Sequence, residues 1–151
     1  MNYRWSKTGG IKALKFDERA IIMQITDEQL VEKAKSILKP RKIKHGFTIG
    51  DVGCALISNK GTIYSGVSID TASGMGFCAE QGAIAAMVTN GEYKIKKIVA
   101  VSEYGIIPPC GACREFMSQI SEENLDTEVI IGKNKVAKLR ELLPYPWDKA
   151  Y

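Results

Sequence analysis

The sequence lacks the features that mark membrane and exported proteins. It has no run of about 18 consecutive apolar residues, so we predict no membrane-spanning helix. The first ten residues are polar and have no apolar centre, so we expect no secretory signal and take the cytoplasm as the compartment. Internal repeats and low-complexity segments are also missing. A chain of 151 residues that is 45% hydrophobic and 25% charged is typical of one soluble globular domain.

Aromatic residues are missing between the charges of the most basic segment. Residues 1–45 hold eleven Lys or Arg against five Asp or Glu, in a chain of net charge +4. The segment from Lys39 to His45 is the densest part, and it favours either contact with phosphate groups or a solvated helix end and loop. No aromatic side chains alternate with these charges to stack on bases. We therefore predict no binding to nucleic acid.

Apolar spacing and turn residues predict alternating helices and strands. Thr26 and Gln29 form a capping-box pattern that begins a helix, which is expected to run to about Lys39. The other expected elements are a hairpin (52–58 and 62–68), helices from 79 to about 90, 112–120 and 138–143, and strands 95–102 and 128–132. This order predicts an α/β domain with a mixed sheet over residues 25–151, preceded by an extension of uncertain order at 1–24.

Four cysteines are the strongest chemical signal: Cys54, Cys78, Cys110 and Cys113. In a chain without an export signal, cysteines are more often metal ligands or reactive groups than disulfides. Three of them open predicted helices, where unpaired backbone N–H groups and the helix dipole favour the thiolate that zinc requires. We expect Cys78, Cys110 and Cys113 to hold one zinc ion and to leave its fourth position open, which is the catalytic pattern. Cys54 is expected to be an ordinary buried side chain on a strand.

Glu80 stands two residues after Cys78 and is expected to serve as a proton shuttle rather than a ligand. The segments Cys78-Ala79-Glu80 and Pro109-Cys110-Gly111-Ala112-Cys113 resemble the motifs of the cytidine deaminase family over roughly residues 26–147. The resemblance implies a three-layer α/β/α fold with a mixed sheet of about five strands. It also implies hydrolytic removal of an amino group from a cytosine nucleoside, with contact between the base and the backbone of Ala79.

Several positions depart from that family's pattern. Ser68 and Asp70 stand where relatives carry Asn and Glu that bind the ribose, so they are either shorter sugar-binding side chains or turn formers. Gly50 stands where a base-stacking aromatic is common, and Phe47 is close in sequence but does not match it. Gln81 replaces an arginine that offsets the charge of three thiolates.

Two further features bear on how the site is completed. Arg114 follows Cys113 and is expected either to supply some of the missing positive charge or to be an exposed helix residue. Tyr145 and Trp147 are expected either to close a base pocket, in this subunit or a neighbouring one, or to pack the last helix. The resemblance implies a homo-oligomer, a tetramer rather than a dimer.

Four functions remain open from the sequence. The first is deamination of cytidine or deoxycytidine, and the second is deamination of a modified cytosine nucleoside, because the departures resemble blasticidin S deaminase. The third is a zinc-bearing interaction module without catalysis, against which Glu80 argues. The fourth, editing of DNA or RNA, is disfavoured because such enzymes usually carry His at the position of Cys78.

Overall fold

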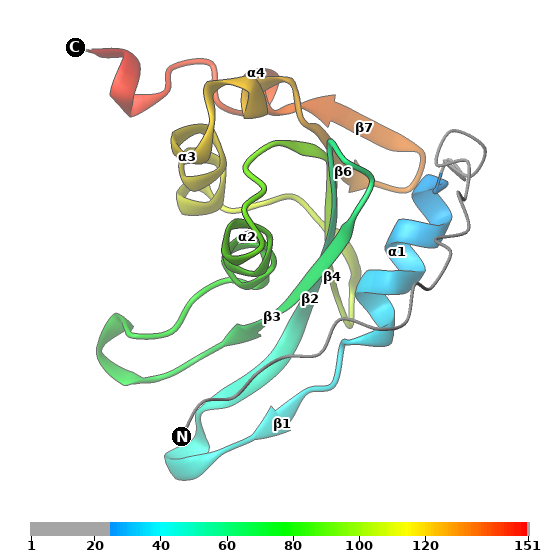
Figure 1. The fold of residues 1–151 in the computed structure, drawn as a ribbon. Helices are drawn as coiled ribbons and strands as arrows, with labels where there is room; N and C mark the ends of the chain where they lie inside the picture. The colour runs from blue at the N-terminus through cyan, green and yellow to red at the C-terminus, as the bar shows by residue number, and fades with distance from the viewer. Residues whose placement is uncertain (1–24, 151) are drawn as a thin grey trace, which may run out of the picture.

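The computed structural model describes residues 25–150, so the extension predicted for residues 1–24 lies outside the described residues. One sheet is covered by helices on both faces (Figure 1). Helix α1 (Asp27–Ser36) lies on one face, and α2 (Ala79–Thr89) and α3 (Gly111–Ile120) lie on the other. The expected three-layer α/β/α architecture is confirmed. Within the described residues no helix is long and apolar enough to cross a membrane.

The sheet has seven strands and is mixed, as expected. Its order is β1-β2-β4-β6-β7, with β3 paired to β2 and β5 paired to β4, and only the β4–β6 pair is parallel. The five longer strands match the expected number, and the additional strands β1 and β5 are short. The bounds are β1 (Arg41–Lys42), β2 (Thr48–Ser58), β3 (Ile63–Ile69), β4 (Ile95–Ser102), β5 (Gly105–Ile107), β6 (Glu128–Gly132) and β7 (Lys135–Lys138).

Two apolar cores lie on the two faces of this sheet, because side chains alternate along each strand. On β2, Cys54 and Leu56 pack toward α2 and α3, whereas Ala55 and Ile57 pack toward α1. Cys54 is fully buried, which confirms the expectation of an ordinary core residue. Buried Asn124 borders the core on the α2 and α3 face, where its side-chain oxygen accepts the N–H of Ile95 and its amide donates to two backbone carbonyls. These contacts fasten the end of α3 to the start of β4.

Local signals located the start of α1 better than its end. The capping box at Thr26 and Gln29 forms as predicted, with reciprocal hydrogen bonds of 2.9 and 3.2 Å. Helix α1 ends at Ser36 rather than near Lys39, because the Ser36 hydroxyl donates to the carbonyl of Lys33 and competes with the helical backbone pattern. The remaining short elements are α4 (Leu139–Leu142) and the 3-10 turns η1 (Lys44–Gly46), η2 (Ala72–Gly74), η3 (Glu122–Asp126) and η4 (Trp147–Ala150).

Candidate metal centre and active site

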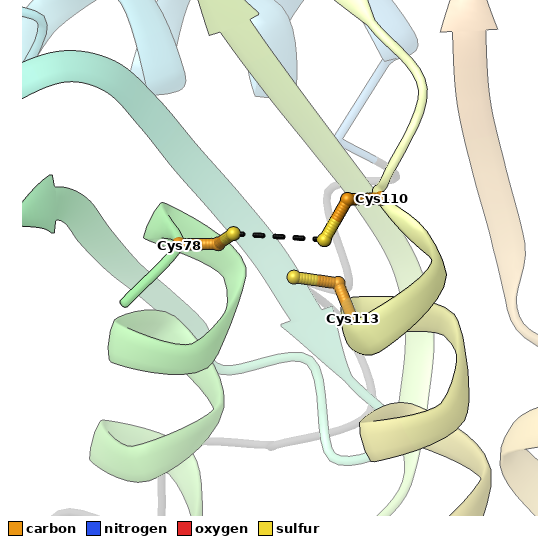
Figure 2. A group of neighbouring side chains, drawn as sticks. All are labelled: Cys78, Cys110 and Cys113. Atoms are coloured by element: carbon orange, nitrogen blue, oxygen red, sulfur yellow. Dashed lines mark hydrogen bonds between the residues drawn. The ribbon is translucent and has the colours of Figure 1, made fainter. Parts of the chain in front are cut away.

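Two helices direct three cysteine sulfurs toward one point (Figure 2). Cys78 caps the N-terminus of α2, Cys110 caps α3, and Cys113 lies in the first turn of α3. The three sulfurs lie within 4.8 Å of one another, and those of Cys78 and Cys110 are 3.6 Å apart. Tetrahedral zinc with Zn–S bonds of about 2.3 Å separates its sulfurs by about 3.8 Å. The donor set therefore fits one zinc ion, and three ligands leave a fourth position for substrate chemistry.

The thiols of this cluster influence one another's protonation. Burial raises the pKa of Cys113, and the neighbouring charge of Glu80 raises it further. Burial also raises the pKa of Cys78, together with a hydrogen bond to Cys110. Burial acts in the same direction on Cys110, but hydrogen bonds from the backbone and thiol of Cys113 outweigh it and lower the pKa. Three thiolates beside a carboxylate repel one another, so a divalent cation is the natural counter-charge for this cluster.

Zinc binding is expected to weaken as the pH falls, because protons and zinc compete for the same sulfurs. Cys113, whose pKa is raised, holds its proton in the metal-free protein at neutral pH, so binding must release that proton. We expect the dissociation constant of zinc to be larger at pH 6 than at pH 8, once the chelator's own zinc affinity at each pH is included. Titration with a chromophoric chelator measures this directly. Equal zinc retention at both values would show that the thiols are not the ligands.

Pairing between the end of β3 and the segment before α2 sets the position of Cys78. Ile69 and Phe77 exchange backbone hydrogen bonds of 3.0 and 2.9 Å and form an isolated bridge. Cys78 follows immediately, and its N–H donates to the side-chain oxygen of Gln81 at 3.3 Å. Gln81 thus completes a capping box at the start of α2. Gln81 stands where the family has an arginine. Here it forms a hydrogen bond at the N-terminus of α2, next to the expected zinc ligand Cys78.

Arg114 anchors the other ligand-bearing helix. Its Nε donates to the carbonyl of Pro109 at 2.8 Å, and Nη1 donates to the carbonyl of Leu142 at 3.1 Å. Pro109 is buried and directly precedes Cys110. Arg114 is itself partly buried, so it is not the exposed helix residue that one of the two expectations described. Its guanidinium joins the residue before Cys110 to the end of α4.

Glu80 lies in the first turn of α2, is 5% exposed, and follows the fully buried Ala79. Burial raises the pKa of Glu80, while its own backbone N–H and the thiol of Cys113 lower it by hydrogen bonding. Those hydrogen-bonding partners place the carboxyl beside the sulfur cluster. A carboxyl that is largely removed from water, next to a position that can hold a metal ion, is suited to accepting and returning a proton.

A close backbone contact holds α2 against the sheet. It was not expected from the sequence. A Cβ at Gly66 of β3 would lie 2.3 Å from the backbone N of Ala83 and 2.6 Å from the carbonyl oxygen of Ala79. Gly82 faces Gly66 from the helix, so two glycines meet at the contact. A glycine inside a strand is a signal for such close approach and points to Gly66. The first turn of α2, which carries Glu80, is positioned by this contact.

The two residues expected to bind the sugar lie where β3 leads toward Cys78. Ser68 is partly buried, and its hydroxyl oxygen accepts the N–H of Val52 at 2.9 Å, where the pairing of β2 with β3 is irregular. The Ser68 hydroxyl proton is still available to a ligand. Asp70 is exposed, and its backbone N–H donates to the carbonyl of Thr48 at 2.7 Å.

Gly50 has a structural reason for lacking an aromatic ring. It is buried and has a φ of +76°, and a Cβ there would lie 2.6 Å from the carbonyl oxygen of Lys39. The site of the expected base-stacking residue is therefore filled by the backbone that leads into β1. Phe47 is partly buried on the neighbouring loop.

The aromatic residues near the C-terminus are largely exposed. Tyr145 is 90% exposed and Trp147 is 63% exposed, while the backbone N–H of Trp147 donates to the carboxylate of Glu115 on α3. The interpretation that Tyr145 packs the last helix is wrong, since its ring lies in solvent in the single chain. The backbone contact of Trp147 holds this segment against the helix that bears Cys110 and Cys113.

Comparison with known proteins places this geometry in a family. Residues 24–129 match the model described as "Cytidine and deoxycytidylate deaminase zinc-binding region". A probable cytidine deaminase of Dictyostelium discoideum is 40% identical over 68 residues, which cover 43% of this chain and 46% of that protein, so the matched part spans about half of its length. The blasticidin-S deaminase of Bacillus cereus is 31% identical over 108 residues, covering 65% of this chain and 77% of the relative.

The fold is similar to that of a solved relative as well. The crystal structure of cytidine deaminase from Burkholderia pseudomallei superposes with a TM-score of 0.67 at 30% identity, covering 81% of this chain and 99% of that one. The family model spans the three cysteines and Glu80, and the structure brings the three sulfurs together with that carboxyl beside them. The chain belongs to the cytidine and deoxycytidylate deaminase family.

Proposed function

We propose that this protein is a zinc-dependent deaminase that converts the cytosine ring of a nucleoside to uracil and releases ammonia. The observation that supports this most strongly is the approach of the Cys78, Cys110 and Cys113 sulfurs to within 4.8 Å, with the buried Glu80 beside them. Cys78, Cys110 and Cys113 hold the metal in this proposal. Zinc, when bound, supplies Lewis acidity that makes water nucleophilic near neutral pH.

Glu80 moves the protons that the reaction requires. Its carboxylate takes a proton from the attacking water and delivers it to the ring nitrogen. The same group then transfers a second proton to the amino nitrogen, which leaves as ammonia, so that one water is consumed and one ammonia is formed. The short link from Cys78 through Ala79 to Glu80, in the first turn of α2, keeps the carboxyl next to the metal position. The backbone of Ala79 is placed to contact the base in this scheme.

The substrate is assigned to the class of cytosine nucleosides, with Ser68 and Asp70 on the sugar side. Both lie near the strand end that leads to Cys78, and each offers oxygen atoms for a sugar hydroxyl. A modified cytosine nucleoside such as blasticidin S is the second candidate. It is supported by Gly50, because the backbone of Lys39 occupies the space where a base-stacking ring would lie.

A substrate panel tests the proposal. Cytidine, deoxycytidine and blasticidin S are incubated with the zinc-loaded protein, and ammonia release is measured by a coupled assay. We expect ammonia from at least one of these compounds, and the largest kcat/KM assigns the substrate. Binding of zinc without ammonia from any of them would support the alternative of an interaction module.

We also propose a homo-oligomer, a tetramer rather than a dimer, in which Tyr145 and Trp147 cover the site of a neighbouring subunit. The exposure of these two large aromatic side chains in the single chain supports this, because exposed apolar surface favours association. The cytoplasm is the proposed compartment, since a reducing environment keeps the four cysteines as thiols available to zinc.

A further inference from the structure

A groove of about 610 Å³ lies between α1 and the β6–β7 hairpin, on the face of the sheet opposite to α2 and α3 (Figure 1). The proposed reaction does not use it. Its apolar surface comes from Val31 on α1, Ile106 on β5 and Ile130 on β6, and the ring of Tyr104 stands 91% exposed beside them. An open apolar groove of this size marks a place where a chain segment or a ligand binds.

The charges around the groove largely compensate one another. Asp27 pairs with Lys97. Glu32 pairs with Lys35 at 2.9 Å. The other charged side chains that line the groove are one acid on α1 and two bases on the hairpin: Glu28, Lys133 and Lys135. Because charges of both signs balance at its edges, the groove favours an uncharged apolar occupant over an ion.

The chain itself supplies such an occupant next to the groove. Residues 20–23, which precede the described residues, read Ala-Ile-Ile-Met and carry no charge. Ile25, the first described residue, packs against the same core cluster as Val31 and Ile106. Asp27, two residues further on, already lines the groove. The uncharged run therefore joins the described fold at the groove.

Chain length keeps this run near the groove. An extended chain covers at most about 3.6 Å per residue, so all four residues lie within about 18 Å of Ile25. The groove follows α1 from Asp27 to Lys35, a length of about 12 Å at the helical rise of about 1.5 Å per residue. A run tethered this closely meets the groove at a high effective concentration, so a few apolar contacts are enough to hold it there.

We propose that residues 20–23 bind in the groove between α1 and the β6–β7 hairpin and cover Val31, Ile106 and the ring of Tyr104. The inference does not depend on the proposed deaminase function, because the groove and the helices that carry the zinc ligands lie on opposite faces of the sheet. The same run from a second copy of the chain is less suited to this groove, because it has no tether and must reach the groove by diffusion.

Limited digestion of the full-length, zinc-loaded protein with trypsin tests the inference. Trypsin cleaves after Arg19, directly before the run, and mass spectrometry follows the rate. One variant, Ile21→Ser/Ile22→Ser, changes the run, and another, Val31→Ser/Tyr104→Ser, changes the groove. We expect each to raise the rate of cleavage after Arg19 about tenfold, because proteolysis tracks the population of the open segment. Peptides of residues 12–26 with and without the serines correct for trypsin's own sequence preference.

Matched controls carry the same kinds of change elsewhere. Ile11→Ser/Leu14→Ser alters apolar residues farther from the tether, and Tyr93→Ser alters an exposed ring outside the groove. Both should be cleaved at the rate of the unaltered protein. Tyr104→Ser alone changes only an exposed ring, so it keeps the test valid where Val31→Ser lowers the stability of α1.

Three results would overturn the inference. The first is cleavage of the unaltered protein after Arg19 at the rate of the free peptide. The second is a response to Ile21→Ser/Ile22→Ser without any response to Tyr104→Ser or to Val31→Ser/Tyr104→Ser, since the run would then bind elsewhere. The third is protection that disappears on roughly hundredfold dilution of the protein, which would assign the groove to the run of a second copy.

Discussion

Glu80→Gln is expected to retain zinc and to lose turnover by a factor between about a hundred and ten thousand, the range that general acid–base catalysis contributes. Glutamine has nearly the same shape as glutamate, so the first turn of α2 and the cysteine positions should be preserved. It has no carboxylate to accept a proton from water, and the transfers to the ring nitrogen and to the leaving amino group are lost. Metal content by atomic absorption and ammonia release from the best substrate measure the two effects separately.

A suitable control for this variant is Glu32→Gln. Glu32 is an exposed residue of α1 that pairs with Lys35 on the surface, and exposed pairs contribute little to stability. Its replacement should leave both zinc and turnover unchanged. If Glu80→Gln kept the rate of the unaltered protein, the assignment of Glu80 as the proton shuttle would be wrong, even with the cysteines confirmed as ligands.

Gly66→Ala is expected to destabilise the fold by about 3 kcal/mol and to disturb the metal site, since overpacking typically costs about 1–3 kcal/mol and this contact lies between backbone atoms. The added Cβ would lie 2.3 Å from the backbone N of Ala83, so neither partner can yield by rotating a side chain. Helix α2 must move away from β3, and it carries Cys78 and Glu80 at its N-terminus. Urea unfolding measures the free energy change, and zinc content measures the effect on the site.

Gly132→Ala separates the backbone clash from the general effect of replacing a glycine. Gly132 lies in β6, and a Cβ there would meet only the Cβ of Lys135 at 3.8 Å, an ordinary contact. The variant should change the free energy of unfolding by less than about 1 kcal/mol and leave zinc content unaltered. Equal destabilisation by Gly66→Ala and Gly132→Ala would contradict the role given to the close packing of α2 on β3.

The sequence by itself determined those features that depend on a few neighbouring residues. The capping box of Thr26 and Gln29 is closed by residues three positions apart, and the core strand at residues 95–102 is bounded by its own apolar run. The spacing of Cys110 and Cys113 within one helical turn is equally local. The expectation of a zinc ion follows from these local patterns together with Cys78, because the chemistry of zinc sites restricts which residue types can appear there. The expected reaction came instead from the resemblance of the cysteine and Glu80 motifs to those of the deaminase family.

Only the tertiary structure decided how segments distant in the chain meet. Ser68 accepts the N–H of Val52, and Gly50 makes room for the carbonyl of Lys39, although nothing near either residue in the sequence indicates its partner. Strand β1 has only two residues and forms because β2 offers it a free edge, so no periodicity could predict it. Long-range pairing and close backbone packing depend on the whole fold, and for this reason they, rather than the cysteine motifs, bear on the substrate.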